Sequence, residues 1–274
     1  MHWITDIHTH SKYSCDGVDS LSDMLAAAQK KGVAFYGVSE HFDFELIYRP
    51  EEETVTDAES YFHAARHLQE DYEGVMNVLV GVEFGFRPTA RSYEQILAIC
   101  KKYRPDFIVN SIHSVNGVDY YYQKPYYRDG VLRPQKEVYE EYLTVIEESL
   151  DAPYPYDIVG HIGYACRYAP YENKTLRVCD YQEQIDRILK KIIQKGKILE
   201  VNASSSGLDH QTLPSYELVQ RYFELGGRLI SYGSDAHACE NIACNREEIT
   251  AKLKQIGFTH ITIPFHGDYI KVEL

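Results

Sequence analysis

The sequence is short of basic residues and of long apolar runs, and each shortage excludes a class of protein. Lys and Arg number 28 against 41 Asp and Glu, which gives the 274 residues a formal net charge of −13. This balance repels nucleic-acid backbones, so we expect no nucleic-acid partner. No run approaches the ~20 apolar residues of a membrane-spanning helix, so we also expect no membrane partner. A small anionic substrate stays compatible, because bound cations reverse the sign of the charge locally.

Paired cysteines, signal segments and linkers are missing as well. The six cysteines form no C-x-x-C pair, and the first residues lack the basic and apolar regions of a secretory signal. Reduced thiols and a cytoplasmic protein are therefore expected. The apolar fraction of 44% suffices for a sizeable core, and no repeat or Pro/Ser-rich linker divides the chain. We expect residues 1–274 to form a single domain.

Apolar runs alternate with helical patterns along most of the chain. The runs are apolar throughout, as expected for parallel strands that are buried on both faces. Strands are predicted over residues 3–7, 34–38, 78–82, 107–112, 157–160, 198–201 and 229–233. Helices are predicted over 24–31, 56–72 (with Thr56 in a capping box), 92–103, 135–150, 181–195, 214–225 and 247–255. A closed or nearly closed α/β barrel of seven units fits this order best, and a doubly wound open sheet is the second candidate.

Metal-ligand residue types stand at the ends of the predicted strands. His8 and His10 follow the first strand at i and i+2, so both side chains point to the same side. An isolated H-x-H is more often a pair of polar strand-end residues without a ligand. Here, however, only the sixth strand, which ends at Asn202, lacks a ligand type. In a parallel barrel all these ends open on the face that carries active sites.

The number and kind of these residues favour a cluster of transition metals. One zinc-type ion takes about three or four protein ligands, so nine candidates suit about two to three ions. Mixed imidazole and carboxylate ligands favour Zn²⁺, Mn²⁺ or Fe²⁺ over Mg²⁺ or Ca²⁺. The candidate metal ligands are His8, His10, Asp16, His41, Glu83, His113, His161, Asp235 and His237.

The motifs taken together resemble the polymerase and histidinol phosphatase (PHP) family. Length and arrangement are most similar to its stand-alone histidinol-phosphate phosphatases. The resemblance covers nearly the whole chain, and all motifs occur in order. They are Asp6-x-His8-x-His10-Ser11-x-x-Ser14-x-Asp16-Gly17, Glu40-His41, Gly81-x-Glu83, Ser111-x-His113, Gly160-His161 and Gly233-Ser234-Asp235-Ala236-His237.

The resemblance implies a distorted (β/α)7 barrel, similar to a TIM barrel, with a trinuclear metal site at the C-terminal ends of the strands. It implies one ion on His8, His10, Glu83 and Asp235, a second on the bridging Glu83 with His113 and His161, and a third on Asp16, His41 and His237. Some members of the family carry histidine in place of Asp16. A carboxylate there is a harder ligand, which favours manganese or iron.

The chemistry that we expect is hydrolysis of a phosphomonoester. Clustered divalent ions lower the pKa of a bridging water and neutralise the phosphoryl oxygens. Our hypothesis is direct attack by a metal-bridging hydroxide, with Glu83, Asp235 and His237 as the catalytic residues that hold it through the metals. A phosphocysteine route is not indicated, because Arg246 lies one place too far from Cys239 for a C-x5-R loop.

Candidate substrate-binding residues lie on the loops that follow the predicted strands. Arg167 is the first candidate for a phosphate clamp, with a solvated loop arginine as the alternative. Weaker candidates for the phosphate are Lys124, Arg128 and Arg246. Asp43, Glu45 and His210 are candidates for contacting an amino or imidazolium group.

Two further features of the loops have open interpretations. The tyrosine-rich insertion over residues 119–127 is either a lid that stacks on a ring of the substrate or a packed surface. Cys15, next to the candidate ligand Asp16, is expected to be a buried bystander.

The first functional hypothesis is therefore a histidinol-phosphatase of histidine biosynthesis, which converts L-histidinol phosphate to L-histidinol and phosphate. The second is a phosphatase of the same kind for a nucleotide, a sugar phosphate or phosphotyrosine. An exonuclease is disfavoured by the acidic charge, and a non-catalytic metal-binding protein by the complete ligand set.

Overall fold

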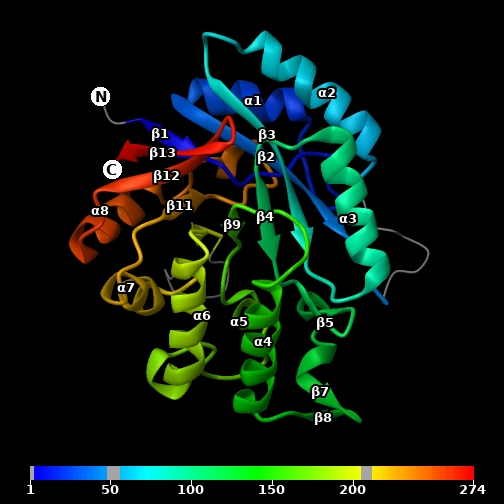
Figure 1. Cartoon of the computed structure of the whole chain (residues 1–274), viewed down its shortest axis with the longest axis vertical. Helices are drawn as coiled ribbons and strands as arrows, with labels where there is room; N and C mark the ends of the chain where they lie inside the picture. The colour runs from blue at the N-terminus through cyan, green and yellow to red at the C-terminus, as the bar shows by residue number, and fades with distance from the viewer. Residues whose placement is uncertain (1–2, 48–55, 205–211) are drawn as a thin grey trace.

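The centre of the molecule is a sheet of seven strands in which every neighbouring pair is parallel (Figure 1). The computed structural model describes residues 3–47, 56–204 and 212–274. The α/β class predicted from the alternating pattern is confirmed. In sheet order the strands are β1 (Ile4–Asp6), β2 (Val33–Asp43), β3 (Asn77–Gly85), β4 (Ile108–Ser111), β9 (Ile158–Val159), β10 (Ile198–Asn202) and β11 (Ile230–Gly233).

Hydrogen bonds beyond the two edge strands bring the sheet close to a closed barrel. The backbone N–H of Asp235 donates to the carbonyl of His8 at 2.8 Å, and that of His10 donates to the carbonyl of Ala236 at 2.8 Å. These bonds continue the parallel pairing past the ends of β1 and β11. The barrel is therefore confirmed over the open sheet, and it closes through the segments that carry His8, His10 and Asp235.

Helices cover the outside of the barrel, and capping residues fix where several of them begin. The side chains of Ser20, Asp57 and Thr89 accept hydrogen bonds from backbone N–H groups in the first turns of the helices that follow them. The helices that alternate with the barrel strands are α1 (Leu21–Lys30), α2 (Ala58–Asp71), α3 (Ala90–Tyr103), α4 (Gln135–Ser149), α6 (Gln182–Gln194), α7 (Tyr216–Glu224) and α8 (Arg246–Ile256).

Apolar side chains at helical spacing pack these helices on the sheet. In α6 the buried residues are Ile185, Ile188, Leu189 and Ile192, which form one stripe. Buried apolar residues from Ile7 to Leu274 form one core cluster. None of the described helices is long and apolar enough to cross a membrane.

The expected helix cap at Thr56 is wrong by one residue. Asp57 caps α2, while the Thr56 hydroxyl lies within 2.8 Å of the carbonyl of His41 and 3.0 Å of the carbonyl of Tyr13. Thr56 is thus buried under the end of β2, where it ties the start of α2 to the barrel rim.

Residues 114–134 build the insertion between β4 and α4 from short pieces, on the side to which the barrel strands point (Figure 1). Tyr120 and Tyr126 are buried, whereas Tyr121 and Tyr127 are exposed. The insertion contains β5 (Ser114–Val115), β6 (Val118–Asp119), the 3-10 helices η1 (Tyr120–Tyr122) and η2 (Lys124–Tyr126), β7 (Tyr127–Arg128) and β8 (Val131–Leu132). The 3-10 helices η3 (Val178–Asp180) and η4 (Cys239–Asn241) and the one-turn helix α5 (Tyr164–Arg167) lie in later loops.

The end of the chain forms a hairpin that the sequence did not predict. The apolar run at residues 259–264 becomes β12 (His260–Phe265), which pairs antiparallel with β13 (Asp268–Glu273). His266 and Gly267 join them with φ values of 52° and 82°. Positive φ at both central residues is the geometry of a two-residue hairpin turn.

Candidate metal centre

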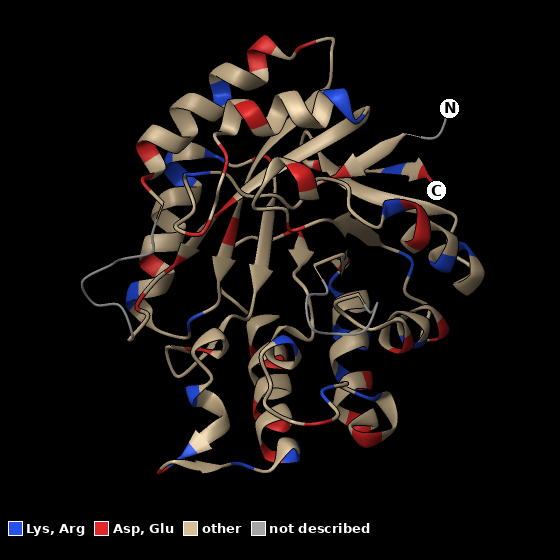
Figure 2. Cartoon of the chain, turned by 180° about the vertical axis from the view of Figure 1, so that it is seen from behind, with Lys and Arg blue, Asp and Glu red and all other residues tan. Residues whose placement is uncertain are grey.

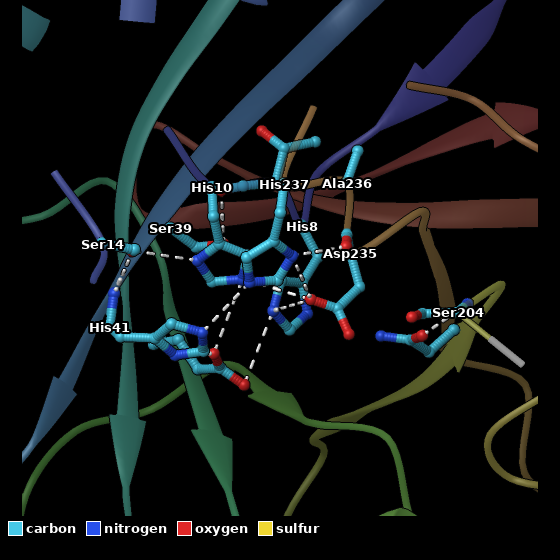
Figure 3. A network of polar contacts seen from close by, with 12 residues as sticks. His8, His10, Ser14, Ser39, His41, Ser204, Asp235, Ala236 and His237 are labelled. Atoms are coloured by element: carbon cyan, nitrogen blue, oxygen red, sulfur yellow. Dashed lines mark hydrogen bonds and ion pairs between the residues drawn. The ribbon is translucent and has the colours of Figure 1, made fainter. Parts of the chain in front are cut away.

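The nine predicted ligands meet at the end of the barrel to which the strands point. Figure 3 shows His8, His10, His41, Asp235 and His237 with their side chains turned toward one another. His41 and Glu83 lie within β2 and β3, which extend further than predicted, and the others follow the ends of their strands. The predicted convergence of the strand ends is therefore present in the structure. Four overlapping groups of ligand atoms lie within 4.8 Å of one another: His8 with His10 and Asp235, His8 with Glu83 and His161, His41 with Glu83 and His113, and His10 with His41 and His237.

Glu83 stands at the centre of the cluster and is fully buried. Its Oε1 lies 2.8 Å from Nε2 of His161 and 3.1 Å from Nε2 of His113. Its Oε2 lies 2.7 Å from Nδ1 of His41. Burial opposes ionisation of this carboxyl, but the charges of His113, His8 and His41 outweigh it and hold its pKa well below the usual range. Glu83 is therefore an ionised carboxylate with histidines on both of its oxygens.

His8, His10 and Asp235 form a second part of the cluster. Nε2 of His10 lies 3.3 Å from Oδ1 of Asp235, and Nε2 of His8 lies 3.9 Å from the same oxygen. Asp235 adopts a left-handed backbone conformation with φ 54°, which few non-glycine residues do without a functional constraint. Burial, with the charges of His41 and His237, holds the pKa of His10 well below its usual value. His10 is therefore a neutral imidazole, the form that binds metals.

Asp16, His41 and His237 form the outer part of the cluster. Nε2 of His237 lies 3.3 Å from Asp16 Oδ2, and Nε2 of His41 lies 3.8 Å from Asp16 Oδ1. The Asp16 side chain is 58% exposed, against 6% for Asp235. Asp16 thus faces the same two histidines that the resemblance assigns to it, at the open side of the site.

The donors fit divalent metal ions. Nε2 of His8 and Nε2 of His10 are buried and have no hydrogen-bond partner. Burying such nitrogens costs free energy unless they bind a metal ion or another electrophile. The Nε2 atoms of His113 and His161 face each other at 3.4 Å, as do those of His41 and His237. Two nitrogens held at about 2.0–2.1 Å by one tetrahedral zinc lie roughly 3.4 Å apart.

Carboxylates behind the cluster orient its histidines. Glu200 in β10 is buried, with Oε1 2.5 Å from Nδ1 of His8 and Oε2 accepting the backbone N–H of His161 at 2.7 Å. Asp43 Oδ1 lies 2.9 Å from Nδ1 of His113. Such partners fix the tautomer, so that the other ring nitrogen, Nε2, is free to bind a metal.

Glu200 was missed in the sequence, where it stands inside an apolar run. A carboxylate in a strand buried on both faces was the available signal, because a buried charge needs a partner. Since the side chains at i and i+2 share a face, Asn202 lies on the barrel side with Glu200. Asn202 is buried and its Oδ1 accepts the N–H of Ser204 at 2.8 Å, so none of the described residues at the end of β10 joins the candidate ligands.

Replacing Glu200 with Gln keeps the shape of the side chain but removes the charge behind His8. We expect metal affinity to fall by about 10- to 100-fold, as for other partners of metal-bound histidines. Competition with a chromophoric chelator measures the affinity, and Glu217→Gln on the exposed start of α7 is the control. An affinity equal to that of the wild type would show that Glu200 does not support the centre.

A cavity of about 260 Å³ opens above the cluster, lined by ligands, by loop residues after β9 and by the tyrosine-rich insertion. Arg167, the candidate phosphate clamp, lines it, with Nη2 3.6 Å from Asp235 Oδ2 and its side chain only 10% exposed. Arg167 also donates to the carbonyl of Ser204. The alternative of a solvated loop arginine is therefore wrong.

The other basic candidates lie elsewhere. Lys124, Arg128 and Arg246 are not among the described residues that line the cavity. Arg128 pairs with Glu137 at 2.5 Å, and the guanidinium of Arg246 lies 4.9 Å from the ring centre of Tyr232.

The candidates for contacting an amino or imidazolium group also differ in whether they line the cavity. Asp43 lines the cavity, although it is bonded to His113, whereas the carboxylate of Glu45 accepts from the hydroxyl of Thr89 outside it. His210 lies outside the described residues. The expectation that Cys15 is buried is wrong, because Cys15 is exposed and lines the cavity.

The tyrosines of the insertion are divided between the cavity and the core. Tyr121 and Tyr122 line the cavity, while Tyr120 and Tyr126 pack in the core. Tyr164 and Tyr168, from the loop after β9, complete the aromatic wall. The sequence did not indicate that these two tyrosines belong to the site.

The fold and the cluster define a class, that of α/β barrels with a histidine and carboxylate metal centre at the C-terminal ends of the strands. The PHP domain model matches residues 6–204, and the chain belongs to this family. The PHP-family resemblance seen in the motifs is thus confirmed. The chain is a PHP-family phosphatase, and histidinol-phosphatases are among the relatives that it resembles over nearly its whole length.

The relatives match nearly the whole chain. A probable histidinol-phosphatase of Clostridium acetobutylicum is 31% identical over 88% of this chain and 89% of its own length. The histidinol-phosphatase of Lactococcus lactis is 26% identical over 96% of this chain and 94% of its own. The structure of the Lactococcus lactis enzyme, with zinc, L-histidinol and phosphate, has a TM-score of 0.86 at 23% identity and covers 98% of this chain and 99% of that one.

Proposed function

We propose that residues 1–274 act as a single metal-dependent phosphomonoesterase domain that hydrolyses L-histidinol phosphate to L-histidinol and phosphate. The main support for this proposal is that Arg167 lines the same cavity as the ligand cluster. A phosphate group in this cavity has metal ligands on one side and a nearly buried guanidinium on the other. The names of the relatives support histidinol phosphate as the substrate.

Four overlapping groups of donors support two to three ions. On the partition that the family resemblance implies, His8, His10 and Asp235 would hold one ion, His113 and His161 a second, with Glu83 contributing to both, and Asp16, His41 and His237 a third. Zinc, manganese and iron all suit these donors. When bound, such ions lower the pKa of a coordinated water and neutralise charge on the phosphoryl oxygens. Glu83, Asp235 and His237 would be catalytic in this sense, because they would hold the ions.

The protein's own side chains bind and orient. Arg167 donates its guanidinium N–H groups to the phosphoryl oxygens, and its Nε, which is buried without a partner, is available for that bond. Glu200 and Asp43 hold the rings of His8 and His113 in the ligand orientation. The cavity wall of tyrosines limits the access of water to the reacting phosphate.

Replacing Arg167 with Ala tests the phosphate clamp. We expect kcat/KM for phosphomonoesters to fall by about tenfold or more, because a charged donor in a site shielded from water is lost. Steady-state phosphate release measures this, with Arg128→Ala on the exposed hairpin as the control. Unchanged kinetics of the Arg167 variant would remove this residue from the site.

The substrate is tested by phosphate release from a panel. The panel contains histidinol phosphate, a nucleotide, a sugar phosphate and phosphotyrosine, each with Zn²⁺, Mn²⁺ and Fe²⁺. We expect the highest kcat/KM with histidinol phosphate. A clear preference for another member of the panel would replace the substrate in this proposal while keeping the phosphatase.

In Figure 2 the Lys and Arg of the described chain are scattered among Asp and Glu over the outer helices and loops, which gives a nucleic acid no basic face in this view.

A further inference from the structure

One carboxylate of the tyrosine-rich insertion faces the cavity with neutral partners. Asp119 ends β6 and lines the cavity above the ligand cluster. Its Oδ1 accepts the backbone N–H of Tyr121 at 2.7 Å and the hydroxyl of Tyr164 at 3.3 Å. A carboxylate has about four acceptor positions, so these two bonds leave capacity for a further donor.

The other carboxylates of the cavity are already engaged. Asp16 and Asp235 face ring nitrogens of the cluster, and Asp43 Oδ1 lies 2.9 Å from Nδ1 of His113. Arg167 is the only Lys or Arg among the described residues that line the cavity, and it faces Asp235. Asp119 is thus a cavity carboxylate that is neither a candidate ligand nor a partner of one.

A shielded carboxylate whose hydrogen-bond partners are neutral is costly to keep ionised, and the nearby charges of His113 and Asp43 act on the pKa of Asp119 in opposite directions. Burial raises the pKa of Asp119, which is the direction expected for such a group. A cation that enters the cavity relieves this cost, since it supplies both the charge and the missing donor. The surroundings of Asp119 therefore favour a positively charged group of a ligand.

Tyr164 connects the two ends of the cavity. Its ring centre lies 5.7 Å from the guanidinium carbon of Arg167 and 5.0 Å from the ring of His113, while its hydroxyl reaches Asp119. Tyr121 and Tyr168, whose ring centres lie 5.4 Å apart, extend the aromatic wall. Aromatic faces attract ammonium groups and planar cationic rings. An anion-binding end at Arg167 and a cation-binding end at Asp119 are thus joined by one tyrosine side chain.

We propose that Asp119 binds the cationic group of the substrate, so that this centre selects phosphomonoesters that carry an ammonium or imidazolium group. This inference rests on the proposed phosphatase function and adds the residue that sets its selectivity. It replaces Glu45, which lies outside the cavity, as the partner for such a group. Asp119 is a specificity-determining residue, and the phosphate end of the cavity does not depend on it.

The test compares a cationic with a neutral substrate in wild type and Asp119→Asn, both loaded with metal. The substrates are L-histidinol phosphate and phosphoethanolamine, which carry a cation, and p-nitrophenyl phosphate, which does not. In the variant we expect kcat/KM for the preferred cationic ester to fall on the order of 30-fold, the loss of one charged hydrogen bond, with little change for p-nitrophenyl phosphate. Asparagine keeps an oxygen for the N–H of Tyr121. Asp129→Asn, in the exposed turn of the same insertion, is the matched control.

The outcomes separate this inference from the proposed function. An equal loss on cationic and neutral esters would overturn the role of Asp119 in selectivity, as would unchanged kinetics on both. If phosphoethanolamine exceeded histidinol phosphate in the wild type while the variant still lost its selectivity, the inference would hold and the proposed substrate would be wrong. As a second readout, inhibition of p-nitrophenyl phosphate hydrolysis by L-histidinol should weaken by a similar factor in Asp119→Asn, while inhibition by inorganic phosphate should not.

Discussion

Replacing Glu83 with Gln is expected to abolish phosphatase activity and to remove metal from the protein. Glu83 lies within 3.1 Å of ring nitrogens of His41, His113 and His161 and is the carboxylate shared by two of the four ligand groups. Gln keeps the volume and one oxygen but loses the charge that balances the ions. Loss of several kcal/mol of transition-state stabilisation lowers kcat by about a thousandfold or more.

Two measurements check the Glu83 variant, phosphate release and metal content by elemental analysis. Glu59→Gln on α2 is the matched control, because Glu59 is 82% exposed and its ion pair with Lys102 at 3.3 Å lies on the surface. We expect that control to keep full activity and full metal content. A Glu83→Gln protein that retained both would show that the carboxylate does not hold the ions.

Removing the metals with a chelator is expected to lower the Tm strongly. The cluster buries imidazole nitrogens and carboxylate oxygens that lack sufficient partners among themselves, and bound ions satisfy them. Each ion that binds only the folded chain contributes about 4 kcal/mol when its free concentration is a thousandfold above its Kd. Since 1 kcal/mol shifts the Tm of domains of similar size by roughly 2–4 °C, we expect a decrease of about 10 °C or more.

Thermal unfolding followed by circular dichroism, with and without chelator, measures the decrease in Tm. The Glu83→Gln variant is the internal control, because a protein that has already lost ions should respond much less to the chelator. Equal Tm values for chelated and untreated wild type would mean that the cluster is stable without ions.

Sequence reasoning located most residues of the cluster because their positions follow from local geometry. His8 and His10 share a side through the period of a strand, and all the other candidates except Asp16 follow apolar runs that read as parallel strands. These signals are contained in a few neighbouring residues each. The alternation of strand and helix patterns along the chain also predicts the barrel, because this prediction does not depend on which loops contact one another.

The residues that sequence reasoning missed depend on contacts between distant segments. Glu200 is 192 positions from His8, and only the folded barrel brings them to 2.5 Å. Asp119 and Tyr164 meet across the cavity from two different loops. The exposure of Cys15 and the position of Tyr168 in the cavity wall follow from loop paths that no periodicity encodes. Loops are set by tertiary contacts, whereas strand ends are set by the pattern of the strand itself.

Metal titration of the chelated protein tests the central claim most directly. The metal-free protein is titrated with Zn²⁺, Mn²⁺ or Fe²⁺, and phosphate release from L-histidinol phosphate is followed at each addition. We predict no activity at the start and a rise that saturates at about two to three equivalents of metal, as expected for a centre with shared ligands. Activity in the metal-free protein, or a protein that binds the metals and stays inactive on every phosphomonoester, would contradict the account.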